Sequence, residues 1–102
     1  MASVPMPGGL TGEKPANSDV QQITDGVRSE VEAKVGRKFE EYEAVRFRTQ
    51  VVAGVNYFVK MRVATTDYIH TRIYVPLPGQ GGSTLTSVQT GKTEQDPIEF
   101  FD

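Results

Sequence analysis

The chain has 102 residues, of which 37% are apolar and 24% charged, and its net charge is −2. This length and composition are those of one compact domain, so we expect residues 1–102 to form a single domain without extensive disorder. The basic residues between positions 37 and 72 are interrupted by acidic ones and alternate along the predicted strands. A solvated sheet surface explains them better than an electrostatic site does, so we expect no nucleic-acid partner.

The chain contains no cysteine. This excludes a disulfide framework, a thiolate nucleophile and thiolate metal ligands, and it fits a reducing compartment. The N-terminus has neither the basic start nor the apolar run of a signal peptide, and no stretch approaches the roughly 20 apolar residues of a membrane span. We therefore expect a cytoplasmic protein, with the nucleus left open as a second compartment, and no membrane partner.

Residues 1–16 are rich in proline and glycine and show no helical or strand period over most of their length. Such a segment cannot bury itself. We therefore expect it to be flexible until a partner holds it, and residues 1–9 to form a flexible N-terminal segment.

A helix is predicted from Ser18 to Val35. Ser18 and Gln21 have the spacing of a capping box, and Gly36 stands in the usual position of a C-terminal stop. Apolar residues recur at helical spacing along one stripe, namely Val20, Ile23, Val27, Val31 and Val35. Gly26 interrupts this helix at a cost of about 1 kcal/mol relative to alanine, so packing against a sheet must hold the helix together.

From Phe39 onward the apolar period changes to two. Residues 45–51, 55–63 and 69–75 alternate apolar with more polar side chains, and a weaker run of the same kind covers residues 85–90. Each run predicts an antiparallel strand with one buried face and one largely wet face. One helix followed by four strands with short turns predicts an α+β fold in which an antiparallel sheet wraps a single helix.

The sequence offers no pair of catalytic groups. The single histidine, His70, lies in the middle of a predicted strand on its more polar face, where we expect it to be partly exposed. A catalytic histidine needs an oriented partner, and a metal site needs several His, Cys or carboxylate ligands. Nucleophile-elbow and phosphate-binding glycine motifs are missing as well. We therefore expect a protein that is not an enzyme and uses neither metal nor cofactor.

Three predicted turns carry apolar residues, at positions 7–10, 50–54 and 76–79. Alternate turns of a hairpin sheet share one edge, and the N-terminal segment can reach that edge because it precedes a helix that runs back across the sheet. One interpretation is a single apolar edge that binds a partner. The other is ordinary turn chemistry, in which Gly54 supplies a positive φ and Pro78-Gly79 a turn. Consecutive valines in a tight turn slightly favour the first interpretation.

Residues 50–54 read Gln-Val-Val-Ala-Gly, which is the motif of the cystatin superfamily. Met6-Pro7-Gly8-Gly9 and Leu77-Pro78-Gly79 resemble the family's two other contact elements in order and spacing. Length, missing cysteines and the missing signal peptide are similar to those of the stefins, the type 1 cystatins. The resemblance covers residues 6–101 and implies a cystatin-like fold, with one long α-helix wrapped by a four- to five-stranded antiparallel β-sheet.

The resemblance also implies a function. Stefins are reversible, tight-binding, competitive inhibitors of papain-like cysteine proteases, including the cathepsin L, S, H and B class, and they insert a tripartite wedge into the active-site cleft. The implied protease-binding residues are Pro7, Gly8, Gly9, Gln50, Val51, Val52, Ala53, Gly54, Leu77, Pro78 and Gly79. The alternative is a non-inhibitory or engineered scaffold that uses the same hairpin edge for another ligand. We expect a monomer, with a domain-swapped dimer as a second state, because the strained turn at Val51-Val52 could straighten into one long strand.

Overall fold

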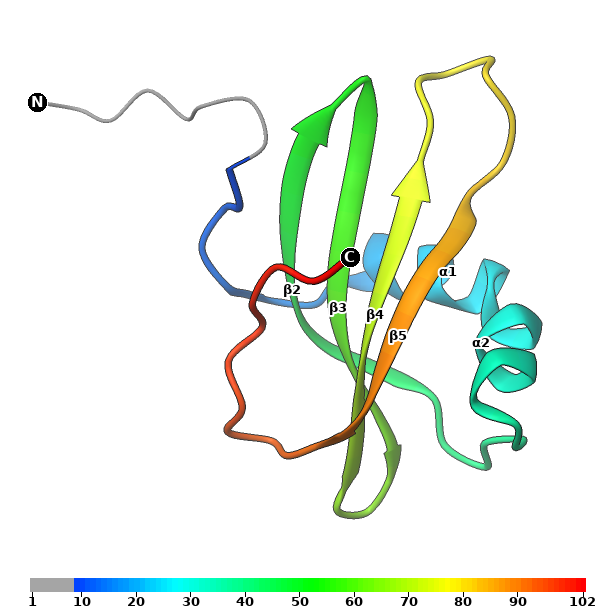
Figure 1. Ribbon diagram of the computed structural model, residues 1–102, viewed down its shortest axis with the longest axis vertical. Helices are drawn as coiled ribbons and strands as arrows, with labels where there is room; N and C mark the ends of the chain where they lie inside the picture. The colour runs from blue at the N-terminus through cyan, green and yellow to red at the C-terminus, as the bar shows by residue number, and fades with distance from the viewer. Residues whose placement is uncertain (1–8) are drawn as a thin grey trace, which may run out of the picture.

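Five antiparallel strands form one sheet in the computed structural model, which describes residues 9–102 (Figure 1). The strands are β1 (Lys14–Pro15), β2 (Glu43–Val52), β3 (Gly54–Ala64), β4 (Asp67–Val75) and β5 (Thr84–Lys92). They lie in the sheet in their order along the chain, and every neighbouring pair is antiparallel. The predicted α+β class is confirmed, with the sheet at the upper end of the predicted strand number.

Two consecutive helices, α1 (Ser18–Gly26) and α2 (Arg28–Val35), lie across one face of the sheet (Figure 1). They replace the single long helix of the prediction. The break falls at Val27, directly after the glycine, where φ is −115° and ψ is 12°. Glycine is a poor helix former because it has no side chain to restrict its backbone, and the helix axis changes direction directly after Gly26.

The ends of this helical region are capped. Asn17, rather than the predicted Ser18, is the N-cap, since its side-chain oxygen accepts a hydrogen bond from the Val20 amide at 2.9 Å. Both residue types make good caps, so sequence spacing alone could not separate them. Gly36 ends α2 in the left-handed region with φ of 85°, as predicted.

The core lies between the helices and the sheet. Its buried residues are Val20, Val27, Val31, Phe39, Tyr42, Val59, Met61, Val63, Ile69 and Ile73. The Tyr42 hydroxyl donates to the Thr24 carbonyl at 2.8 Å and so joins α1 to the chain that enters β2. A β-bulge between Ala44 and Arg46 shifts the register of β2. As a result Ala44 packs against the core, where simple alternation had placed its neighbour Val45.

The other face of the sheet is not largely wet, contrary to the prediction. Phe58, Lys60 and His70 are each at most 1% exposed there. The chain after β5 turns back and crosses this face, on the side opposite the helices (Figure 1). Ile98, within that returning segment, is fully buried. We call residues 93–101 the C-terminal strap.

Part of the N-terminal region is also held, although residues 1–16 were predicted to be flexible. β1 pairs with β2, and Leu10 forms an isolated bridge with Gln50. The Thr11 amide donates to the Thr49 carbonyl, and the Thr49 amide donates to the Thr11 hydroxyl, both at 2.9 Å. Backbone pairing with the edge of β2 therefore orders residues 10–16, whereas the expectation for residues 1–8 lies outside the described residues.

Candidate functional site

The predicted binding residues that the structure describes gather at one end of the molecule. The β2–β3 hairpin and the β4–β5 loop both lie at the top in Figure 1, and the beginning of the described chain lies beside β2 near the same end. Pro7 and Gly8 lie outside the described residues. Gly9 is exposed and is followed by the bridge between Leu10 and Gln50. We call the described residues of these three segments, 9–10, 50–54 and 76–79, the hairpin edge.

The first hairpin exposes apolar side chains at its tip. Val51 is 64% exposed and Val52 is 42% exposed. Val51 pairs with Val55 and Val52 with Gly54, so the tip is part of the β2–β3 ladder rather than a loose loop. Two valines are therefore displayed to solvent on a backbone that is already fixed, and burying each against a partner would contribute on the order of 1.5–3 kcal/mol.

Gly54 has to be glycine for two reasons. Its φ is 112°, which L-residues with a side chain rarely adopt. A Cβ built there would also lie 2.6 Å from the Val75 carbonyl oxygen and 2.9 Å from the Tyr74 hydroxyl. The first hairpin thus packs directly against the end of β4, from which the second loop leaves.

Two polar side chains that sequence reasoning missed hold the first hairpin in shape. The Tyr74 hydroxyl donates a hydrogen bond to the Ala53 carbonyl at the tip. The Asn56 side-chain amide donates to the Gln50 side-chain oxygen at 2.8 Å, and both residues are buried. Gln50 and Asn56 are also direct cross-strand partners. Their equal distance from the turn was a usable signal, because residues equidistant from a hairpin tip face each other.

The second loop presents one large apolar side chain, Leu77, which is 52% exposed. Its start is closed by a hydrogen bond from the Gln80 amide to the Leu77 carbonyl at 3.0 Å. Gly79 supports this turn with φ of 84°. Pro78 is exposed beside Leu77. Leu77 is thus held by a closed turn at the same end of the molecule as Val51 and Val52.

His70 is remote from any catalytic arrangement. It is fully buried rather than partly exposed, and neither ring nitrogen has a hydrogen-bond partner among residues 9–102. Burial lowers the pKa of His70 to about 4, with a smaller contribution from the neighbouring cation of Lys60. The imidazole is therefore neutral at physiological pH and inaccessible to solvent.

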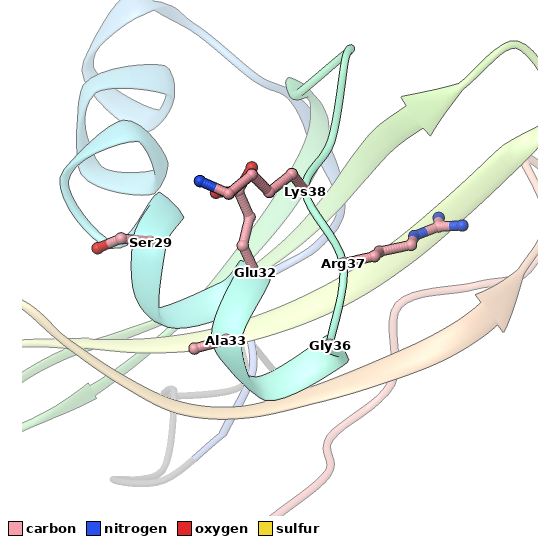
Figure 2. Close-up of a pocket in the computed structure, with 6 residues that line it drawn as sticks. All are labelled: Ser29, Glu32, Ala33, Gly36, Arg37 and Lys38. Atoms are coloured by element: carbon pink, nitrogen blue, oxygen red, sulfur yellow. The ribbon is translucent and has the colours of Figure 1, made fainter.

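A hollow of about 400 Å³ lies at the end of α2, away from the hairpin edge, and is lined by Ser29, Glu32, Ala33, Gly36, Arg37 and Lys38 (Figure 2). Its one carboxylate is engaged in structure. Glu32 accepts hydrogen bonds from the Phe39 amide at 2.9 Å and from the Arg28 side chain at 3.2 Å. The Phe39 hydrogen bond is the main reason that the pKa of Glu32 is lowered. The Glu32 side chain therefore stabilises the connection between α2 and β2. We assign no ligand to the hollow.

Within residues 9–102, no three His, Cys, Asp or Glu side chains gather in a way that could hold a metal ion. No helix in the same part of the chain is long and apolar enough to cross a membrane. The described surface thus offers a rigid apolar edge and no grouped catalytic or ligating side chains.

Known proteins resemble this chain over most of its length. Residues 8–95 match a family model described as Cystatin domain. The chain is similar to Cystatin-A of Mus musculus, with 44% identity over 96 residues that cover 94% of this chain and 99% of the relative. It is also similar to Cystatin-B of Homo sapiens, with 40% identity over 97 residues, 94% of this chain and 99% of the relative. Cystatin-B of Oplegnathus fasciatus is 39% identical over 97 residues, with 94% and 97% covered.

Proposed function

The chain belongs to the cystatin family, and on that premise we propose that it is a reversible, tight-binding, competitive inhibitor of papain-like cysteine proteases. The resemblance to the cystatin superfamily, and to its stefins, is confirmed by the family model and by the similarity to Cystatin-A and Cystatin-B. Members of the family inhibit cysteine proteases and are not enzymes.

The observation that supports the proposal most is the display of Val51, Val52 and Leu77 on fixed turns at one end of the sheet. Apolar side chains that leave water on docking supply the driving force for association. Turns that are already held by Tyr74 and Gln80 lose little conformational entropy when they bind. The hairpin edge therefore suits a concave, partly apolar cleft.

In the proposed complex the three segments of the hairpin edge enter the protease cleft together. Residues Gln50–Gly54 cover the centre of the cleft, and Leu77, Pro78 and Gly79 cover the primed side. Pro7, Gly8 and Gly9 occupy the non-primed side, where the glycines let the backbone turn away from the catalytic cysteine. No peptide bond is presented for cleavage, so binding excludes substrate without covalent chemistry.

The proposal extends to the partner and the setting. Cathepsins of the L, S, H and B class are the proposed targets, and a monomeric single domain in the cytoplasm is the proposed active form. A domain-swapped dimer, in which the turn at Val51-Val52 straightens, would bury the first hairpin and lose inhibition. Size-exclusion chromatography after mild heating tests this second state, and a chain that stays strictly monomeric contradicts it.

The test of inhibition is a titration of papain with a fluorogenic substrate, using the wild-type chain and Val51→Asp. Burying a charge at the centre of the cleft should weaken binding about 100-fold or more, which corresponds to roughly 2.7 kcal/mol. Because Val51 is exposed, the free energy of unfolding should change by no more than about 0.5 kcal/mol.

The matched control is Thr66→Asp, which adds the same charge to the exposed turn between β3 and β4 at the other end of the sheet. It should leave inhibition unchanged. A wild-type chain that fails to inhibit at micromolar concentration would sink the proposal. Equal inhibition by Val51→Asp and Thr66→Asp would refute the placement of the first hairpin in the cleft.

A further inference from the structure

Two side chains join the N-terminal region to the C-terminal strap. One Glu13 carboxylate oxygen accepts a hydrogen bond from the Ile98 amide at 2.9 Å, and the other accepts from the Arg46 side chain at 3.1 Å. Arg48 donates to the Thr11 carbonyl at 2.7 Å and to the Ile98 carbonyl at 2.5 Å. The Ile98 amide is therefore bound by the side chain of Glu13. The Ile98 carbonyl is bound by Arg48, which also binds the Thr11 carbonyl.

The strap is itself firmly anchored, so it can serve as a fixed support. The Lys60 ammonium group donates to the carbonyls of Thr93, Glu94 and Asp96 at 3.0, 2.6 and 2.6 Å. Ile98 is fully buried. The Phe58 ring packs against those of Phe100 and Phe101, with centroids 5.7 and 5.6 Å apart. Arg72 donates to the Phe101 carbonyl at 3.1 Å.

The joined residues directly follow the proposed inhibitory arm, residues 1–9, along the chain. Thr11 pairs with Thr49, and Leu10 bridges to Gln50, which is directly followed by the exposed Val51. Residues 10 and 11 are thus held beside the end of β2. Backbone pairing there is short, since β1 has only two residues, Lys14 and Pro15. Glu13 and Arg48 supply charge-assisted hydrogen bonds, which are stronger than bonds between neutral groups.

We propose that Glu13 and Arg48 are positioning residues that use the C-terminal strap to hold residues 10–13 beside the first hairpin, where the proposed inhibitory arm is attached. This inference rests on the proposed function and deepens it. The strap need not touch the protease. It holds residues 10–13 in place, and loss of the contact raises the apparent dissociation constant by the inverse of the fraction of molecules in which these residues stay beside the first hairpin.

The electrostatics of Glu13 agree with this role. The hydrogen bond from the Ile98 amide lowers the pKa of Glu13, and Arg46 and Lys60 act in the same direction. A carboxylate held in this way is ionised at neutral pH, which is the form that accepts both hydrogen bonds.

A double-mutant cycle against papain tests the inference in the full chain. Glu13→Ala should weaken binding about 10-fold, or roughly 1.4 kcal/mol. Gly8→Arg by itself should remove the contribution of the arm to binding. In that background Glu13→Ala should change binding by less than about 2-fold, because fixing the attachment of an arm that no longer binds cannot affect affinity. A merely structural role for Glu13 predicts the same factor in both backgrounds.

Glu43→Ala is the matched control, since Glu43 also pairs with an arginine of the sheet, Arg62, at 3.0 Å. That pair lies at the start of β2, whereas Leu10 is bridged to Gln50 near its end, so Glu43→Ala should leave inhibition unchanged. A factor for Glu13→Ala that is equal with and without Gly8→Arg, or no weakening at all, overturns the inference while leaving the proposed function intact.

Amide hydrogen exchange provides a readout that does not depend on inhibition. Exchange of the Thr11 amide should accelerate in Glu13→Ala and in Ile98→Ala, which loosens the strap from its other side, but not in Glu43→Ala. If Ile98→Ala does not fold, Glu13→Ala still decides the question. Should the wild-type chain fail to inhibit papain, the proposed function is lost, and unchanged Thr11 exchange in Glu13→Ala would separately refute the contact.

Discussion

Replacing Gly54 by alanine should be the most damaging single-atom change in the first hairpin. The left-handed backbone costs a side-chain-bearing residue about 1–3 kcal/mol. In addition, the new Cβ would lie 2.6 Å from the Val75 carbonyl oxygen, a backbone atom of β4 that cannot rotate away. Overpacking of this kind costs about 1–3 kcal/mol. The two costs add to about 2–6 kcal/mol of lost unfolding free energy.

Urea unfolding at fixed protein concentration measures this loss, with the slope m checked so that only the midpoint changes. The chain supplies two controls. Gly79 has φ of 84° but open space around its Cβ position, so Gly79→Ala reports the backbone cost alone, about 1–2 kcal/mol. Gly12 has neither constraint, and Gly12→Ala should be neutral within about 0.5 kcal/mol. If Gly54→Ala and Gly79→Ala destabilise equally, the close approach of Gly54 to β4 has no energetic weight and the reasoning is refuted.

Two buried groups beneath the strap give further predictions. Because burial lowers the pKa of His70 to about 4, the unfolded chain takes up a proton at higher pH than the folded one. The free energy of unfolding should therefore contain the full contribution of neutral His70 above about pH 6.5. Between that pH and pH 4 it should fall by up to about 3 kcal/mol. The groups that act on His70 besides burial are Lys60 and Lys92, which lower its pKa, and Asp96 and Glu13, which raise it. Urea midpoints at pH 7 and 4.5 should differ less in His70→Gln, and an identical pH slope would contradict the assignment. Lys60→Met removes the donor of three hydrogen bonds to strap carbonyls, so it should lower the free energy of unfolding by about 2–4 kcal/mol. It should also make residues 93–101 susceptible to limited proteolysis. Lys34→Met, on the exposed side of α2, should have neither effect.

The sequence predicted those parts of the fold that depend on local rules. The valine stripe and Gly36 located the helical region, and the alternation of residues 55–63 and 69–75 located the two central strands. Turn chemistry and the rule that alternate hairpin turns share an edge placed the β2–β3 hairpin and the β4–β5 loop at the same end of the sheet (Figure 1). These are consequences of spacing within a few residues, so one chain is enough to read them.

The strap escaped prediction because it depends on contacts between distant residues. Lys60 and His70 were assigned to a wet face since nothing near them in sequence covers them. A signal was nevertheless present. Phe58 lies on that same face, and a polar tail that contains Ile98, Phe100 and Phe101 offers the apolar surface to cover it. An aromatic residue on a face assigned to solvent is a reason to look for a covering segment elsewhere in the chain.

The hydrogen bond between Glu13 and Ile98 spans a sequence separation of 85 residues. Contacts that close so large a loop are expected to form only after the intervening chain is ordered, since their entropic cost is met late. The β3–β4 hairpin, whose partners are near neighbours in sequence, should assemble first, and the two ends of the chain should meet last. In the folded protein the same order runs in reverse, so the junction of arm and strap should be the first region to open transiently. Folding kinetics would therefore leave the junction of residues 10–13 with the C-terminal strap as the last part of the described domain to form.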